Sequence, residues 1–86
     1  MVELIYPDDR LMVYLPKSND GHRGEVIFQA AHRKAGATLF WHLDDTFLGS
    51  TKEIHQMAST PRPGNHKLLI VDEQGNSSTR YFKVVE

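Results

Sequence analysis

Apolar and polar residues alternate along this chain with a period of two, which is the period of a β-strand with one buried face. The clearest apolar series are Val26, Phe28 and Ala30; Leu39, Trp41 and Leu43; and Phe82 and Val84. Turn-forming residues separate the series about every 8 to 12 residues, a spacing typical of sandwiches and barrels. The pattern predicts an all-β chain. Its strands are expected at residues 2–6, 10–15, 24–33, 37–43, 46–48, 51–58, 66–72 and 77–85, about seven if the first two count as one.

Two short turns predict hairpins of an antiparallel sheet. Asp44 and Asp45 form a two-residue link, because short polar residues tolerate positive φ. Gly75 supplies the left-handed residue of a longer hairpin loop, and the Asp72 carboxylate is placed to accept from that loop's amides. A sheet with one apolar face needs a second sheet to cover it. Since Trp41 matches the buried tryptophan of immunoglobulin-like domains, we expect an immunoglobulin-like antiparallel β-sandwich without the usual cysteines.

Composition excludes several classes of function. With 86 residues the chain forms one domain, which has little interior for an enclosed active site. Ten basic residues against eleven acidic ones give a net charge of -1, so we expect no nucleic-acid partner. The absence of cysteine excludes disulfides, thiolate catalysis and Cys-type zinc sites. Apolar runs such as Leu68 to Val71 are far shorter than the about 20 residues of a membrane span, so this domain is expected to make no membrane contact.

The start of the chain has two interpretations. Met1 is followed directly by strand-like sequence, without the basic head and apolar segment of a signal peptide. The sequence is therefore either a cytosolic protein or a piece of a longer chain. The abrupt start favours the second, and we expect residues 1–86 to be a single domain taken from a longer chain.

Five histidines raise the question of a metal site. The His-Glu-x-x-His pattern is absent, and only His42 and Asp44 place two ligand types on one strand face. A metal-assisted hydrolase would require His42, His55 and His66 to converge. We favour the alternative that His55 and His66 lie at sheet ends and bond to loop backbone, and we expect no metal and no cofactor.

Catalysis through a nucleophile has no support in the sequence. There is no Gly-x-Ser-x-Gly and no Ser-x-x-Lys motif, and the glycines are scattered singly through turns. The paired carboxylates, Asp8 with Asp9 and Asp44 with Asp45, are explained by turn chemistry. We expect that this domain alone is not an enzyme.

Aromatic side chains at outward positions leave binding as a function. Phe40, His42 and Tyr81 fall on the strand face opposite to the buried series and form a candidate binding surface. Such rings stack on sugars or on a partner protein. The alternative is cross-strand packing or cover by a neighbouring domain. The other apolar residues with this outward parity, Ile27, Leu69 and Val71, indicate a surface that is buried in a longer protein.

Five short motifs follow one another along the chain: Trp-x-Leu-Asp from Trp41, Leu-Gly-x-Thr ending at Thr51, a single His55, Pro-Gly-x-His-x-Leu over 63–68 and Val-Asp-x-x-Gly over 71–75. In this order, from about Ile5 to Val84, they resemble the C-terminal domain of the penicillin-binding protein 1C family, in the version found in Bacteroidetes-type bacteria. The matching positions are Trp41, Leu43, Asp44, Gly49, Thr51, His55, Gly64, His66, Leu68, Asp72 and Gly75. The resemblance implies that these residues are structural, as core, turn or hairpin positions.

The resemblance implies a parent enzyme that polymerises and cross-links peptidoglycan, with glycosyltransferase and transpeptidase domains followed by this non-catalytic module. The expected partners are the other domains of the synthase and peptidoglycan or a cell-wall protein. The expected location is the periplasm, with an inner-membrane anchor in the parent chain. The alternative is a free-standing carbohydrate- or protein-binding β-sandwich.

Overall fold

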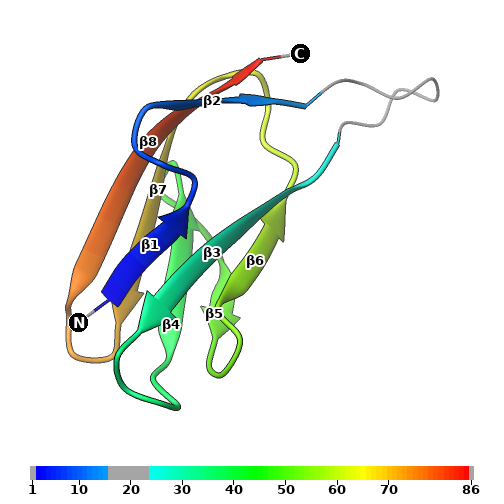
Figure 1. The fold of residues 1–86 in the computed structure, drawn as a ribbon. Coiled ribbons are helices and arrows are strands. Elements are labelled where there is room, and N and C mark those ends of the chain that lie inside the picture. The colour runs from blue at the N-terminus through cyan, green and yellow to red at the C-terminus, as the bar shows by residue number, and fades with distance from the viewer. Residues whose placement is uncertain (1, 16–23, 86) are drawn as a thin grey trace.

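A computed structural model describes residues 2–15 and 24–85, which form eight strands and no helix. The strands are β1 (Val2–Tyr6), β2 (Leu11–Tyr14), β3 (Val26–His32), β4 (Leu39–Leu43), β5 (Thr46–Thr51), β6 (Gln56–Ser59), β7 (Gly64–Asp72) and β8 (Ser77–Val85). A small sheet has the order β1-β3-β6 and a large sheet the order β2-β8-β7-β4-β5. The two sheets lie face to face (Figure 1), which confirms the predicted immunoglobulin-like sandwich with eight strands. No helix of the described part is long and apolar enough to cross a membrane.

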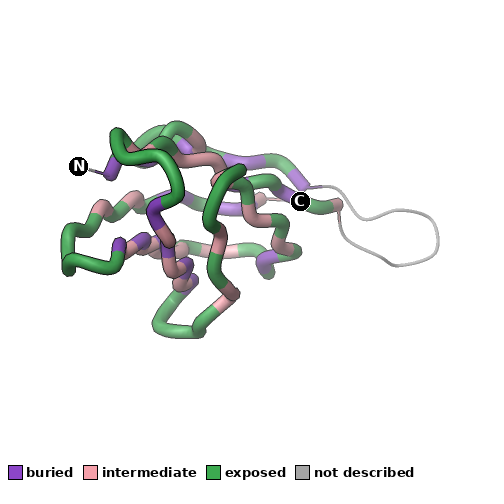
Figure 2. The backbone as a smooth tube through the Cα atoms, turned by 90° about the horizontal axis from the view of Figure 1, so that it is seen from below, coloured by how far each residue is buried: buried purple, intermediate pink, exposed green. Residues whose placement is uncertain are grey.

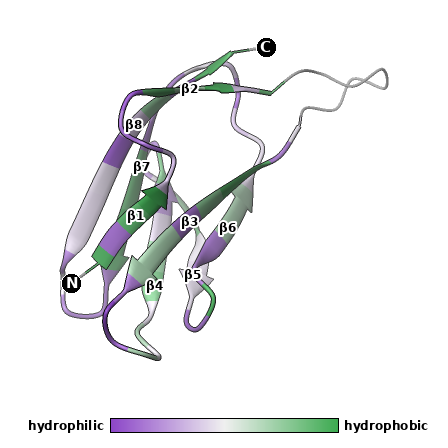
Figure 3. Ribbon diagram, viewed as in Figure 1, coloured by the Kyte–Doolittle hydropathy of each residue, from purple (hydrophilic) through white to green (hydrophobic). Residues whose placement is uncertain are grey.

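The core fills the space between the sheets. Phe28 of the small sheet meets Phe82 of the large one edge to face, with ring centroids 5.7 Å apart. Trp41 and Leu68 are fully buried and Leu43 is nearly so, as their inward parity requires. Figure 3 shows that the first part of β3 is hydrophobic without a break, but Figure 2 shows buried and exposed residues alternating along the strands. The period-two pattern of the sequence therefore identifies the core.

Strand β2 contradicts the expectation of a wholly antiparallel sandwich. It pairs with β8 in parallel, with Leu11 opposite Phe82 and Val13 opposite Val84. Strand β1 pairs with β3 in the other sheet. Treating the first two strands as one is therefore wrong, because residues 7–10 carry the chain from one sheet to the other without reversing its direction.

The strand expected at 51–58 is also wrong. Strand β5 of the large sheet runs on to Thr51, and β6 belongs to the small sheet, so the intervening residues cross between sheets. Gly49 lies inside β5, at a φ of 146°, beside a register shift against β4. The positive φ favours glycine here, and a Cβ at this position would also stand 3.2 Å from the end of the Met57 side chain, which would have to shift slightly. Strand β7 begins at Gly64, where φ is 127°, two residues earlier than expected.

Both predicted hairpin turns are confirmed. Asp44 and Asp45 have φ of 50° and 70° and link the directly paired residues Leu43 and Thr46. In the second turn Gly75 has a φ of 87°, and its amide donates to the Asp72 carbonyl at 3.2 Å. Asp and Gly occupy these sites because they tolerate the positive φ that the two turns require.

Candidate binding surface

The three candidate binding residues lie on the outer face of the large sheet but do not come together. Phe40 is half-buried and pairs with Val71. The ring of His42 lies 5.4 Å from that of Phe47. Tyr81, which is 53% exposed, projects from β8, two strands away from β4 in the sheet order. The sequence identified the face on which these residues lie. Which of them are neighbours on that face follows only from the strand order.

The outward apolar residues are divided between the two sheets. Leu69 and Val71 face outward from β7 of the large sheet. Ile27 is 47% exposed and pairs with Ala58 in the small sheet. The expectation of one surface from all three is wrong, because the two sheets face each other and their outer faces point in opposite directions.

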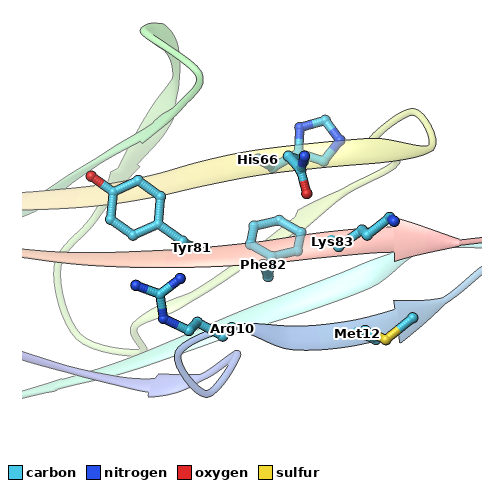
Figure 4. A pocket seen from close by; sticks show the side chains of 7 residues that line it. Arg10, Met12, His66, Tyr81, Phe82 and Lys83 are labelled. Carbon is cyan, nitrogen blue, oxygen red and sulfur yellow. The ribbon is translucent and has the colours of Figure 1, made fainter.

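An open groove of about 540 Å³ lies over β2, β8 and β7 (Figure 4). The side chains around it are those of Arg10, Met12, Asn65, Tyr81 and Lys83. His66 and Phe82 also line the groove. Strand alternation points both of these rings toward the core side, so their backbone forms the floor. The groove therefore has a polar backbone floor and a rim of one aromatic ring, one thioether and several hydrogen-bond donors.

Strand pairing fixes where these side chains stand. Met12 and Asn65 both pair with Lys83, from β2 and β7, so the three residues form a row across the sheet. Tyr81 pairs with Lys67 in the next row on the same face. The exposed ring is consequently bordered by lysines of its own row and of the adjacent row.

Arg10 is held beside Tyr81 by the turn that precedes β2. Its backbone has a φ of 62°, which is uncommon for a residue with a long side chain. Its amide donates to the Tyr81 carbonyl at 2.5 Å, and the next amide, of Leu11, donates to Asp8 at 3.2 Å. Sequence reasoning missed this groove, because its strands come from opposite ends of the chain and no local pattern shows that they pair. The residues missed are Arg10, Met12, Asn65 and Lys83.

His42, His55 and His66 stay apart. His42 faces outward from β4, His55 lies in the connection before β6, and His66 lies on β7 next to the Asp44 turn. Across residues 2–15 and 24–85, no group of three His, Asp or Glu side chains could hold a metal ion. His22 lies outside the described residues. The convergence that a metal-assisted hydrolase would require is absent from the described part of the chain.

Comparison with known sequences places the chain in a family. The profile of the Penicillin-Binding Protein C-terminus Family matches residues 1–84. The chain belongs to this family. No curated protein matches it.

Among solved structures, this penicillin-binding protein C-terminal module is similar to one described as "Structures of Clostridium thermocellum CbhA fibronectin(III)-like modules". The TM-score is 0.67 and the identity 19%, over 98% of this chain and 93% of that chain. At this identity the likeness concerns the fold alone, and it agrees with the two-sheet sandwich. Family and fold together make the chain a non-catalytic accessory module.

A hydrogen-bond relay joins three of the motif residues of this module. Trp41 Nε1 donates to Thr51 Oγ1 at 2.9 Å, and the threonine hydroxyl lies 2.8 Å from His55 Nδ1. Since Oγ1 accepts from the indole, its own hydrogen is free to donate to the imidazole. Burial lowers the pKa of His55, and the electrostatic effect of the nearby His32 lowers it further, which favours the neutral ring that this acceptor role needs. The relay gives the buried tryptophan its polar partner and fixes the end of β5.

Replacing Thr51 tests the relay. In Thr51→Val the shape is kept but the Trp41 indole N–H loses its acceptor, so we expect a loss of about 1–3 kcal/mol of unfolding free energy. Urea denaturation measures it. Ser50→Ala, at the neighbouring exposed position, is the control and should unfold at the wild-type midpoint. Equal midpoints for Thr51→Val and the control would show that the indole needs no partner there.

A second cluster fastens the β4–β5 turn to β7. Asp44 Oδ1 accepts from the Lys67 amide at 2.8 Å, and Oδ2 contacts His66 Nδ1. The other ring nitrogen, Nε2, contacts the Arg62 carbonyl at 2.5 Å. The His66 ring stacks on Phe82, with centroids 5.5 Å apart. His66 thus closes one end of the core with its ring and anchors two loops with its nitrogens.

Asp72 is the buried polar centre of the opposite end of the sandwich. Its Oδ1 accepts from the amides of Gln74 and Asn76, at 2.9 and 2.8 Å. Its Oδ2 accepts from Asn76 Nδ2 at 3.0 Å and from His32 Nε2 at 2.9 Å. His32 Nδ1 accepts from the Lys34 amide at 2.9 Å, which leaves the ring hydrogen on Nε2. These hydrogen bonds, His32 first, hold the pKa of Asp72 far below its ordinary value.

Sequence reasoning expected the bonds within the hairpin but missed His32. A signal was present, because His32 continues the inward series of β3 and a polar residue at an inward position needs a partner. Thr51 and His66 show the same signal in β5 and β7. Inward polar residues at strand ends therefore mark the internal hydrogen bonds of this sandwich.

Proposed function

We propose that this accessory module binds the glycan strands of peptidoglycan and holds its parent synthase on them. The observation that carries the proposal is the open groove beside Tyr81. A flat aromatic ring offers an apolar face to a sugar ring, and hydrogen-bond donors around it hold the hydroxyl and amide groups. The groove volume of about 540 Å³ lies within the range of ligand sites, about 300–1,000 Å³.

In this proposal the parent is a penicillin-binding protein 1C-like synthase with glycosyltransferase and transpeptidase domains. The module acts in the periplasm, with the inner-membrane anchor elsewhere in the parent chain. Its partners are the other domains of the synthase and the glycan. A free-standing carbohydrate-binding module would use the same groove, and the experiment below applies to both.

Removing the aromatic face should reduce glycan binding. We expect Tyr81→Ala to weaken co-sedimentation with purified sacculi about tenfold, because a stacking contact is worth about 0.5–1.5 kcal/mol beyond buried area. Tyr14→Ala is a matched control, since Tyr14 is 67% exposed on the same sheet and does not line the groove. Wild-type binding by Tyr81→Ala, or equal loss in both variants, would contradict a stacking role for the groove.

A second candidate function is docking on another domain of the parent through the β4–β5 side of the same sheet. Phe47 is 57% exposed there and its ring lies beside His42. Phe40, Leu69 and Val71 extend this apolar area. Phe47→Ser would then loosen the module from the rest of the parent, measured by limited proteolysis, and leave sacculus binding intact. Loss of sacculus binding in Phe47→Ser would instead assign this area to the glycan.

A further inference from the structure

We propose that the groove selects glycans that carry carboxylate groups, which Arg10 and Lys83 contact next to the Tyr81 ring. The proposal rests on the proposed function and adds the chemical class of the ligand. A neutral glycan would need only the ring and neutral hydrogen-bond partners. This groove instead places cations at the ring.

The charges around the groove are mostly positive. Arg10 and Lys83 line it, and Lys67 pairs with Tyr81 across the strand boundary. None of the lining residues is an acid. The module as a whole has a net charge of -1, so the excess of cations belongs to this face and not to the composition.

The neighbouring acids leave these cations available. Asp9 Oδ2 lies 3.8 Å from Arg10 Nε, and both side chains are more than half exposed. Asp45 Oδ1 lies 3.6 Å from Lys67 Nζ and is 89% exposed. Exposed pairs of this kind are worth about 0–1 kcal/mol, so a bound anion can displace them. Lys83 forms no ion pair with any residue of the described ranges.

The backbone geometry fixes the position from which the Arg10 side chain extends. The left-handed conformation at a φ of 62° and the amide bond to Tyr81 hold its Cα against β8, next to the ring. An arginine in this place offers a planar donor fork to a carboxylate, while the flexible Lys83 supplies a point charge. Asn65, in the row of Lys83, adds an amide that both donates and accepts, as an acetamido group requires. Ring, amide and cations together fit a carboxylated amino sugar polymer.

Sedimentation against chemically modified sacculi tests the proposal. The sacculi are first treated with hydrofluoric acid, which removes attached phosphate polymers, and one half is then amidated with carbodiimide and excess ammonium chloride, which turns its carboxylates into neutral amides. We expect the wild type to bind amidated sacculi about fivefold to tenfold more weakly than unmodified ones, and with less dependence on salt. The double variant Arg10→Gln, Lys83→Gln should bind both preparations as weakly as the wild type binds the amidated one. Lys52→Gln, at an exposed lysine in the connection after β5, is the control and should bind like the wild type.

The outcomes separate this inference from the function on which it rests. Equal wild-type binding to both preparations, or wild-type binding by the double variant, overturns the carboxylate contact and leaves the glycan function standing if Tyr81→Ala still binds poorly. Binding to a third preparation, sacculi kept without hydrofluoric acid, that is lost after the treatment assigns the anion to a phosphate polymer and overturns the inference. Absence of wild-type binding to every preparation overturns both. Circular dichroism confirms that each variant is folded.

Discussion

Trp41→Ala is expected to unfold this module or leave it only marginally stable. The indole is fully buried on β4, between β7 and β5 of the large sheet, and truncating a large aromatic residue in a core costs about 3–5 kcal/mol. Small domains have a total stability of about 5–15 kcal/mol, and one of 86 residues falls toward the lower end. The substitution also removes the donor of the relay to Thr51, which leaves the threonine and His55 without their third member.

The measurement and its control follow from the same geometry. Trp41 is the single tryptophan, so urea unfolding has to be followed by circular dichroism and not by indole fluorescence. Trp41→Phe keeps most of the buried ring and loses the 2.9 Å hydrogen bond, and we expect it to lose less than half of what alanine loses. A wild-type urea midpoint in Trp41→Ala would contradict the assignment of this side chain to the core.

Much of this fold could be predicted because period-two alternation reports burial directly. Phe28, Trp41 and Leu68 are inward in the pattern and fully buried in the sandwich. The alternation does not indicate in which of the two sheets a strand lies. Residues 7–10 and the segment between β5 and β6 cross from one sheet to the other while the pattern continues, so strand number and the parallel β2–β8 pair followed only from the structure.

The candidate site was predictable only in part, for a related reason. Tyr81 was identified as an outward aromatic residue from its own strand. Arg10 and Lys83 became its neighbours through a pairing between the first and last parts of the chain, which carries no local signature. By contrast, the resemblance to the family picked out Asp44, Thr51 and His66, which the structure places in internal hydrogen bonds, and of these three only His66 also reaches the groove, at its floor. The matching motif positions therefore hold the sandwich together, while none of them contributes a side chain to the rim of the groove.

Asp72 is expected to make the folding stability of this module depend on pH in the acidic range. Four donors converge on its carboxylate, and they hold its pKa far below the ordinary value of 3.8. The folded state consequently resists protonation at this group, whereas the unfolded chain takes up the proton at its ordinary pKa. The stabilisation is therefore fully present above about pH 4 and is lost as the pH falls through the folded value.

Asp72→Asn tests this dependence, because the amide puts an NH₂ group where one carboxylate oxygen now accepts. A donor would then face the His32 and Asn76 donors or the loop amides, and a buried donor without an acceptor is costly. We expect a lower melting temperature than that of the wild type at pH 7, and a difference that narrows as the pH falls from about 4 toward 2, because the unfolded wild-type chain takes up a proton at Asp72 over that range while the folded carboxylate resists it. Asp8→Asn, at an exposed aspartate, controls for the loss of one negative charge and should follow the wild-type profile. A constant difference between Asp72→Asn and the wild type down to pH 2 would mean that the buried carboxylate does not act through its ionised form, and that packing at the hairpin accounts for its place in the fold.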